Sequence, residues 1–244
     1  MKAALIRVGV DHTYGKWNSV ADPCTKEFIY APIPTNAKLS PGMSTDYSQV
    51  SKALGSFPKG CTAGMQPGSI NLPHNLLGKH SHLDPDYEYL TYGDNGDKRG
   101  KIPSGFVSGD LLVFYSGLGN IHKNNLVYAI VGLYVVDKVV KAYMVPPADR
   151  HKNAHTRVDS IYKSDIVVFA KPRVSGRLEK YIEIGEYRDR AYRVTKAMLQ
   201  KWGGLSVKDG YIQRSITPPV YNDPSKFYSW FKEQNIKLIQ RNNP

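Results

Sequence analysis

The amino-acid sequence predicts an α+β fold, in which a mixed, mostly antiparallel sheet is accompanied by a few late helices. Apolar strand-like segments outnumber helix-like segments, and the strongest helical patterns lie after residue 189. Strands also do not alternate regularly with helices, as they do in parallel α/β folds. With 41% hydrophobic and 22% charged residues, the 244-residue chain can bury a core, and we expect one domain over residues 1–244.

Seven segments are expected to be strands, because each combines apolar with β-branched or aromatic residues over a short length. The first, residues 2–10, carries one arginine among Ala, Leu, Ile and Val, and a polar turn begins at Asp11. We expect residues 138–145 to pair with residues 127–136 through a turn at Asp137. The other expected strands are residues 28–30, 110–115, 165–170 and 180–184.

Three segments are expected to be helical. One covers about residues 46–54, inside a long irregular stretch at about residues 35–80 that is rich in Gly, Pro, Ser and Asn; such stretches carry function or are loosely ordered. A second covers residues 189–202 and stops at a Gly-Gly pair. The last covers residues 224–234, where Asp223 is expected to cap the N-terminus. Its apolar stripe consists of Phe227, Trp230 and Phe231.

The positive charge of the chain is concentrated in its C-terminal half. The formal net charge is +12; residues 1–122 hold 11 Lys and Arg against 10 Asp and Glu, and residues 123–244 hold 22 against 11. Basic surfaces attract polyanions, and arginine interleaved with tyrosine offers both phosphate forks and flat faces for bases. We expect a nucleic-acid partner, DNA more than RNA; the structural alternative is a solvated helix with tyrosines packed on the core. The expected contacts are Tyr87, Tyr92, Arg173, Ser175, Arg177, Arg188, Arg190 and Arg193.

Membrane and secretory features are not recognisable in the sequence. The longest apolar run, residues 126–136, has 11 residues, whereas a spanning helix needs ~20. No secretory signal pattern opens the chain, and two cysteines are too few for a four-cysteine zinc site. We expect a cytoplasmic protein without a membrane partner. The sequence does not indicate an oligomeric state.

The densest group of chemically active residues lies at residues 80–94. His80, His82, Asp84 and Asp86 are two residues apart, and in an extended chain such residues share one face. This spacing suits general acid–base catalysis and also a divalent cation, although it matches no zinc signature. The structural alternative is that the carboxylates cap turns and that His82 bonds to the backbone. We assign no metal here and leave open whether His80 and His82 hold one.

A carboxylate at the end of a buried strand, Asp11, is a further candidate. The catalytic candidates are Asp11, His82, Asp84, Asp86 and Asp94. Ser175-Gly176-Arg177 offers a hydroxyl, an amide and a guanidinium to a phosphate. No Walker-type loop and no GxGxxG motif is present, so no nucleotide cofactor is supported and the cofactor stays unknown.

Short motifs follow one another along nearly the whole chain. They are Gly9, Asp11, Gly15 and Ser19, then Pro32-Ile33-Pro34, His82, Asp84-Pro85-Asp86, Tyr92-Gly93-Asp94 and residues 109–117, 175–178 and 204–214. In this order they resemble the nucleotide modification associated domain family, third type. The resemblance implies a place in bacterial and phage systems that modify or recognise altered nucleic-acid bases, including phage defence, without assigning a reaction. It marks as site residues Asp11, Gly15, His82, Asp84, Asp86, Tyr92, Asp94 and Asp110.

A looser likeness concerns two strand-like stretches. Residues 109–115 and 129–133 are similar to the paired strands of PUA-like and EVE-type readers of modified bases. This likeness covers about 30 residues and implies a small, barrel-like sheet, so a PUA-like barrel is one form that the sheet is expected to take.

Three functions are consistent with these patterns. The first is a protein that binds and chemically acts on nucleotides in DNA or RNA, with Asp11 and residues 82–94 meeting at one pocket. The second is a reader that binds a modified base without catalysis. The third is a metal-dependent nuclease that uses His80, His82, Asp84 and Asp86.

Overall fold

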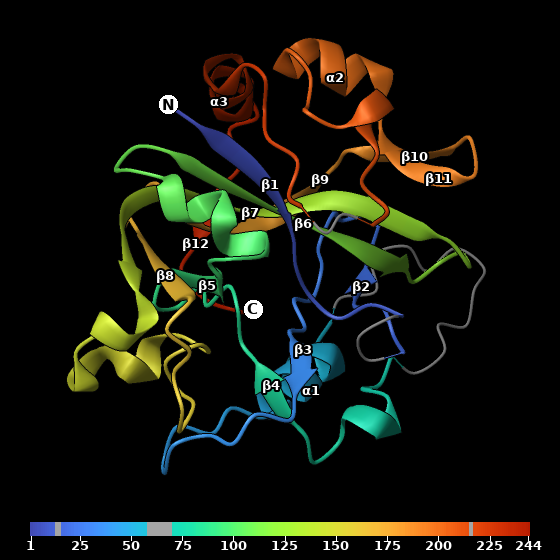
Figure 1. Cartoon of the computed structure of the whole chain (residues 1–244). Helices are drawn as coiled ribbons and strands as arrows, with labels where there is room; N and C mark the ends of the chain where they lie inside the picture. The colour runs from blue at the N-terminus through green and yellow to red at the C-terminus, as the bar shows by residue number, and fades with distance from the viewer. Residues whose placement is uncertain (13–15, 58–69, 215–216) are drawn as a thin grey trace.

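The computed structural model describes residues 1–12, 16–57, 70–214 and 217–244 (Figure 1). Its largest element is a sheet of eight strands. These are β1 (Ala3–Arg7), β2 (Val20–Ala21), β5 (Thr91–Asn95), β6 (Leu111–Asn120), β7 (Leu126–Lys141), β8 (Asp165–Ala170), β9 (Gly176–Glu183) and β12 (Leu238–Ile239). Gly15 and residues 58–69 of the expected irregular stretch lie outside the described residues.

The long strand β7 organises the sheet. One edge of β7 pairs with β6, and the other edge pairs first with β9 and then with β8. The order is β1-β6-β7-β8-β5, with β2 beside β6 and β12 beside β9. The β1–β6 and β2–β6 pairs are parallel, and the other pairs are antiparallel. The expected mixed, mostly antiparallel sheet is confirmed, but within the described residues it does not close into a barrel.

The expectation of a turn at Asp137 is wrong, because β7 continues through this residue to Lys141. Val136 pairs with Ala170 and Lys138 pairs with Phe169, so Asp137 is an extra residue in a β-bulge. A bulge bends and twists a strand without ending it. It lies next to the point where β7 exchanges β9 for β8 as its partner.

Two small antiparallel sheets flank the main one. β3 (Ile33–Thr35) pairs with β4 (His80–His82), and β10 (Gly185–Arg188) pairs with β11 (Ala191–Val194). The second pair replaces the start of the helix expected at residues 189–202. Asp189 and Arg190 both have positive φ, as a two-residue hairpin turn requires. Residues 28–30 form no named strand; Phe28 makes only an isolated bridge to Ala21.

The described residues form three α-helices, which are α1 (Ser48–Gly55), α2 (Lys196–Trp202) and α3 (Pro224–Glu233). The Thr195 side chain accepts a hydrogen bond from the Met198 N–H at the start of α2, and Asp223 accepts one from the Lys226 N–H at the start of α3. The 3-10 turns are His74–Leu76, Arg99–Lys101, Pro103–Gly105, Ala142–Met144, Pro147–Lys152 and Lys208–Gly210. Figure 1 shows α2, α3 and the β10–β11 pair on one side of the main sheet, and α1 with β3 and β4 on the other. In the described parts of the chain, no helix has the length and apolarity to cross a membrane.

A cluster of aromatic rings lies at the centre of the core, around Tyr87. The Tyr87 ring lies edge-on to the rings of Tyr30, Phe114 and Tyr134, at centroid distances of 5.2, 6.0 and 5.8 Å. Its other neighbour is Gly132 of β7, where a Cβ atom would lie 2.5 Å from the Tyr87 ring. The absence of a side chain at residue 132 therefore allows the Tyr87 ring to lie close against β7.

Replacing Gly132 with alanine is expected to destabilise the protein by about 1–3 kcal/mol, the usual cost of overpacking a core. The buried Tyr87 ring is held by three other rings and has little room to move away. Urea unfolding measures the change. Gly105→Ala is the control, because no atom lies within 4 Å of the added Cβ, and its effect should stay within about 0.5 kcal/mol. Equal stability of the two variants would contradict this packing.

Candidate functional site

Two segments that are far apart in the sequence meet beside β4. The first is residues 82–86, and the second is residues 151–157, in the connection from β7 to β8. Asp84 lies opposite His155, with 3.7 Å between the carboxylate Oδ2 and the ring Nε2. Asp86 lies opposite Arg157, with 2.6 Å between Oδ2 and Nη2. The two contacts place a histidine cluster next to a buried ion pair.

The histidine cluster consists of His82, Asp84 and His155. Their ligand-type atoms all lie within 4.8 Å of one another. The Asp84 Oδ2 atom is 3.9 Å from His82 Nε2 and 3.7 Å from His155 Nε2, and the two rings are 4.9 Å apart at their centroids. The Asp84 side chain is 4% exposed, whereas those of His82 and His155 are 24% and 16% exposed. The carboxylate is therefore buried beneath two partly open imidazoles.

Backbone and side-chain donors hold the Asp84 carboxylate in place. The Gly93 N–H donates to both oxygens, at 2.8 Å to Oδ1 and 3.0 Å to Oδ2, and the Asn153 amide donates to Oδ1 at 3.3 Å. Burial raises the pKa of Asp84 to about 7, and the charge of His155 and the Gly93 donor act against this rise. A group with such a shifted pKa, in a cluster with other titratable groups, is typical of functional sites.

The two imidazoles have opposite electrostatic surroundings. Burial, followed by the positive charges of His155 and Arg157, lowers the pKa of His82 to about 3. Burial also acts to lower the pKa of His155, but its hydrogen bond to Asp165 and the charge of Asp84 outweigh burial and raise it. The His155 Nδ1 atom lies 2.7 Å from Asp165 Oδ2. At neutral pH, His82 is therefore uncharged.

Asp94 and Asp11 lie outside the histidine cluster and are connected to each other through Arg99 and Arg7. The Tyr92 hydroxyl donates to Asp94 Oδ2 at 2.5 Å, and Arg99 Nε lies 3.8 Å from the same oxygen. Arg99 also donates to the Arg7 carbonyl, and the Arg7 guanidinium pairs with Asp11 at 3.0 Å. Two arginines thus connect Asp11 to Asp94, so Asp11 approaches the residue 82–94 region indirectly.

The expected face of four residues does not form. His82 and Asp84 belong to the histidine cluster, but Asp86 pairs with Arg157 instead. His80 is exposed, and its Nδ1 atom lies 2.7 Å from the Ser44 hydroxyl. The prediction from the i, i+2 spacing is wrong because β4 ends at His82. Asp84 and Asp86 lie beyond the strand, where alternate residues need not point to the same face.

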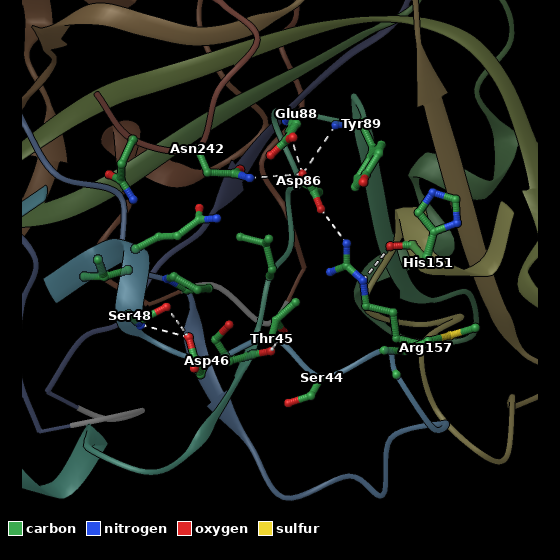
Figure 2. A pocket seen from close by; sticks show the side chains of 18 residues that line it. Ser44, Thr45, Asp46, Ser48, Asp86, Glu88, Tyr89, His151, Arg157 and Asn242 are labelled. Carbon is green, nitrogen blue, oxygen red and sulfur yellow. Dashed lines mark hydrogen bonds and ion pairs between the residues drawn. The ribbon is translucent and has the colours of Figure 1, made fainter. Parts of the chain in front are cut away.

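A polar pocket of about 510 Å³ lies on the side of residues 81–86 opposite the histidine cluster (Figure 2). Residues 42–50, which include the start of α1, form one side. Ser81, Leu83 and Asp86 form another, and the C-terminal Asn242 and Asn243 contribute from the far end of the chain. Since Ser81 and Leu83 line this pocket while His82 and Asp84 form the histidine cluster, one stretch of chain separates the two features.

The Asp86–Arg157 ion pair forms part of the pocket wall. Asp86 Oδ1 accepts hydrogen bonds from the Asn242 amide at 3.1 Å and from the backbone N–H groups of Glu88 and Tyr89 at 3.1 and 3.4 Å. Arg157 donates through Nε to the His151 carbonyl and through Nη2 to Asp86. The Arg157 side chain is only 5% exposed, and its Nη1 atom is buried without a hydrogen-bond partner among the described residues. Figure 2 shows the guanidinium extending from the Arg157 backbone toward Asp86 at the pocket wall.

The expected nucleic-acid contacts divide by burial. Tyr87 and Tyr92 belong to the core, and Ser175 and Arg177 are each 1% exposed. The Ser175 hydroxyl accepts from the Val135 N–H at 2.9 Å. A nucleic acid does not reach these four side chains in this conformation. Tyrosine and arginine are typical of nucleic-acid contacts, but their rings and aliphatic stems are also apolar surfaces that pack in protein cores.

The four remaining arginines lie nearer the surface. Arg173 and Arg190 are exposed. Arg188 and Arg193 are half-buried, and both contact the carboxylate of Asp209. Only the first two therefore present a guanidinium fully to solvent.

The residues that the sequence did not reveal are Asn153, His155, Arg157 and Asp165. Each lies about seventy residues after its partner in the 82–95 region, and neither spacing nor a motif links them. The histidines at 151 and 155, in a short basic connection after two prolines, were the one local signal available.

Comparisons with known proteins give one finding. The family model described as nucleotide modification associated domain 3 matches residues 2–234 of the chain. Searches among curated proteins and among solved structures found no match.

Proposed function

Because the chain belongs to the nucleotide modification associated domain 3 family, we propose that it binds a nucleotide of a nucleic acid in the pocket beside Arg157 and takes part in modifying its base. The observation that carries this proposal is the unpartnered, buried Nη1 atom of Arg157 at the wall of a polar cavity. The nucleic acid is DNA in preference to RNA, as the sequence led us to expect.

The unpartnered donor supports a polar or anionic ligand. A buried charged donor without an acceptor costs free energy, and an oxygen of a phosphate or of a base carbonyl removes that cost. Asp86 satisfies one branch of the Arg157 guanidinium and fixes its plane, so that Nη1 is held in one direction. This is the arrangement of a preorganised recognition group.

The size and lining of the pocket also suit a nucleotide. Its volume of about 510 Å³ lies within the ~300–1,000 Å³ range of small-molecule sites. Hydroxyls and amides such as those of Ser44, Thr45 and Gln49 match the donors and acceptors on base edges. At the rim, the Tyr89 ring is 40% exposed and lies edge-on to the His151 ring at 5.1 Å, which leaves an aromatic surface for stacking.

The basic C-terminal half supports a nucleic acid, rather than a free nucleotide, as the source of the ligand. Residues 123–244 carry an excess of 11 positive charges. Exposed guanidinium groups, as at Arg173 and Arg190, contact backbone phosphates in such complexes. We assign these two arginines to backbone contacts and exclude the buried Ser175 and Arg177 from them.

Catalysis, rather than reading alone, is supported by the histidine cluster next to the pocket. A reader of modified bases needs stacking surfaces and hydrogen-bond partners, but no buried carboxylate between two imidazoles. We therefore propose a base-modifying enzyme, in which Asp11, Asp86 and Asp94 remain candidates beside the cluster. Incubation with DNA, followed by mass analysis of the digested nucleosides, separates the two functions, since a reader leaves every mass unchanged.

Replacing Tyr89 with alanine is expected to weaken binding of single-stranded DNA by about 5- to 150-fold, the equivalent of ~1–3 kcal/mol for one stacked base. Fluorescence anisotropy with a labelled oligonucleotide measures the affinity. Tyr162→Ala is the matched control, because Tyr162 is 69% exposed and does not line the pocket. Equal affinities of the two variants would contradict a base in this pocket.

A second variant tests the arginine directly. Arg157→Lys keeps a positive charge opposite Asp86 but removes the fork that presents Nη1. Binding should weaken at least about 10-fold, the loss of one charge-assisted hydrogen bond. Thermal unfolding of the same variant shows whether the loss comes from the pocket or from the fold, and unchanged affinity in a folded variant would refute the role of Arg157.

A further inference from the structure

The histidine cluster has the composition and arrangement of a metal centre. We propose that His82, Asp84 and His155 bind a divalent transition-metal ion through Nε2, Oδ2 and Nε2. The three residues come from β4, from the segment after it and from the connection to β8. The proposal does not depend on the nucleotide pocket, because the metal can be measured without any nucleic acid.

The distances favour a shared ion over direct hydrogen bonds. At 3.7 and 3.9 Å, the contacts of Asp84 Oδ2 with the two imidazoles are too long for hydrogen bonds. Ligands bound at ~2.1 Å to one tetrahedral or octahedral ion lie ~3.0–3.5 Å from each other. The two distances to Asp84 Oδ2 exceed this range by a few tenths of an ångström, and the ligand-type atoms of all three residues lie within 4.8 Å of one another.

Groups outside the cluster orient the ligands as they do in metal proteins. The His155 Nδ1 atom is engaged with Asp165 Oδ2 at 2.7 Å, which leaves Nε2 directed at Asp84. A carboxylate behind a metal-bound histidine fixes the ring and its tautomer. Both Asp84 oxygens accept from the single Gly93 N–H, and Oδ1 also accepts a hydrogen bond from the Asn153 side-chain amide, so the orientation of the carboxylate is also fixed.

Gly93 allows this arrangement to be compact. A Cβ atom on Gly93 would lie 2.5 Å from the His155 ring and 2.6 Å from the Asn153 side chain. The φ angle of Gly93 is not in the left-handed region, so the requirement comes from space and not from backbone conformation. The glycine thus permits His155 and Asn153 to pack directly over β5.

The donor set indicates the class of ion. Two imidazoles and one carboxylate suit zinc, iron(II) and manganese(II), whereas calcium and magnesium prefer oxygen ligands alone. Three protein ligands also leave coordination positions for water or a substrate. His82 and His155 are 24% and 16% exposed, so one side of the cluster is open to solvent.

The test uses the full-length protein without an affinity tag, stripped with a chelator and titrated with Zn(II) by calorimetry. We expect one ion per chain. His155→Ala and His82→Ala should weaken binding more than about 100-fold, and Asp165→Asn, which acts through His155, about 10- to 100-fold. His80→Ala is the matched control, because His80 is exposed and is bonded to Ser44, and it should leave the affinity unchanged.

A second readout keeps the result independent of folding. Co(II) bound by nitrogen and oxygen ligands absorbs visible light, and the spectrum should change in His82→Ala and be insensitive to His80→Ala. Circular dichroism establishes that each variant is folded. Asp84→Asn is a further variant, which keeps the shape of the side chain and removes its carboxylate. Absence of saturable Zn(II) binding, or an equal loss in His80→Ala, would overturn the proposal.

Discussion

Replacing Asp86 with alanine should destabilise the protein by about 3–5 kcal/mol, because it leaves the buried charge of Arg157 without its partner. The two side chains are 1% and 5% exposed, so the remaining charge of Arg157 would stay shielded from bulk water. The Asn242 amide and the N–H groups of Glu88 and Tyr89 lose their acceptor at the same time.

Guanidinium-induced unfolding, followed by circular dichroism, measures the loss. The control is Asp149→Ala, which breaks an exposed ion pair of 2.7 Å with Lys152 and should cost less than about 1 kcal/mol. The double variant Asp86→Leu, Arg157→Met should recover part of the stability, since it removes both charges instead of one. If Asp86→Ala costs no more than Asp149→Ala, the ion pair does not stabilise the fold.

Replacing Phe227 with alanine should also destabilise the protein by about 3–5 kcal/mol, the usual cost of removing a large buried ring. Phe227 belongs to α3, is 0% exposed and packs against Trp202 of α2. Its ring has centroid distances of 5.5 Å to Trp202 and 4.1 Å to Tyr221. The variant leaves a cavity between the two helices that the surrounding rings cannot fill.

The same unfolding experiment compares this variant with Ser229→Ala on the exposed face of α3. The control should change the stability by no more than about 0.5 kcal/mol. A free energy of unfolding of Phe227→Ala within about 0.5 kcal/mol of that of Ser229→Ala would show that the aromatic cluster contributes little.

Local signals in the sequence predicted the elements whose limits are set locally. The helix expected at residues 224–234 is α3, with Asp223 as its cap, because both the cap and the apolar stripe act within one or two turns. The strand expected at residues 165–170 is β8 with the same limits, since a short run of β-branched residues needs no distant partner to be recognised.

Elements that depend on distant partners were predicted less well. Asp137 is typical of a turn, but pairing with β8 on one side and β6 nearby carries β7 past it in a bulge. Residues 189–194 were expected to begin a helix, yet they complete a hairpin whose turn places Asp189 and Arg190 at positive φ. Neither outcome follows from local propensity, because tertiary pairing decides it.

The candidate site follows the same division. His82 and Asp84 were recognisable from their spacing, and they do lie together. His155 and Arg157 were not, since only the fold brings residues 151–157 against residues 82–86. Tyr87 was misplaced because a tyrosine beside carboxylates looks the same in sequence, whether its ring faces a ligand or packs in the core.

The stretch from Ser81 to Asp86 serves as a partition between two compartments, with the ion pair facing one and the imidazoles facing the other. A partition cannot be displaced toward one compartment without being withdrawn from the other. A ligand that displaces this stretch from the pocket side is therefore expected to move His82 and Asp84 as well, and thermodynamic reciprocity requires any resulting change in affinity to be the same factor in both directions.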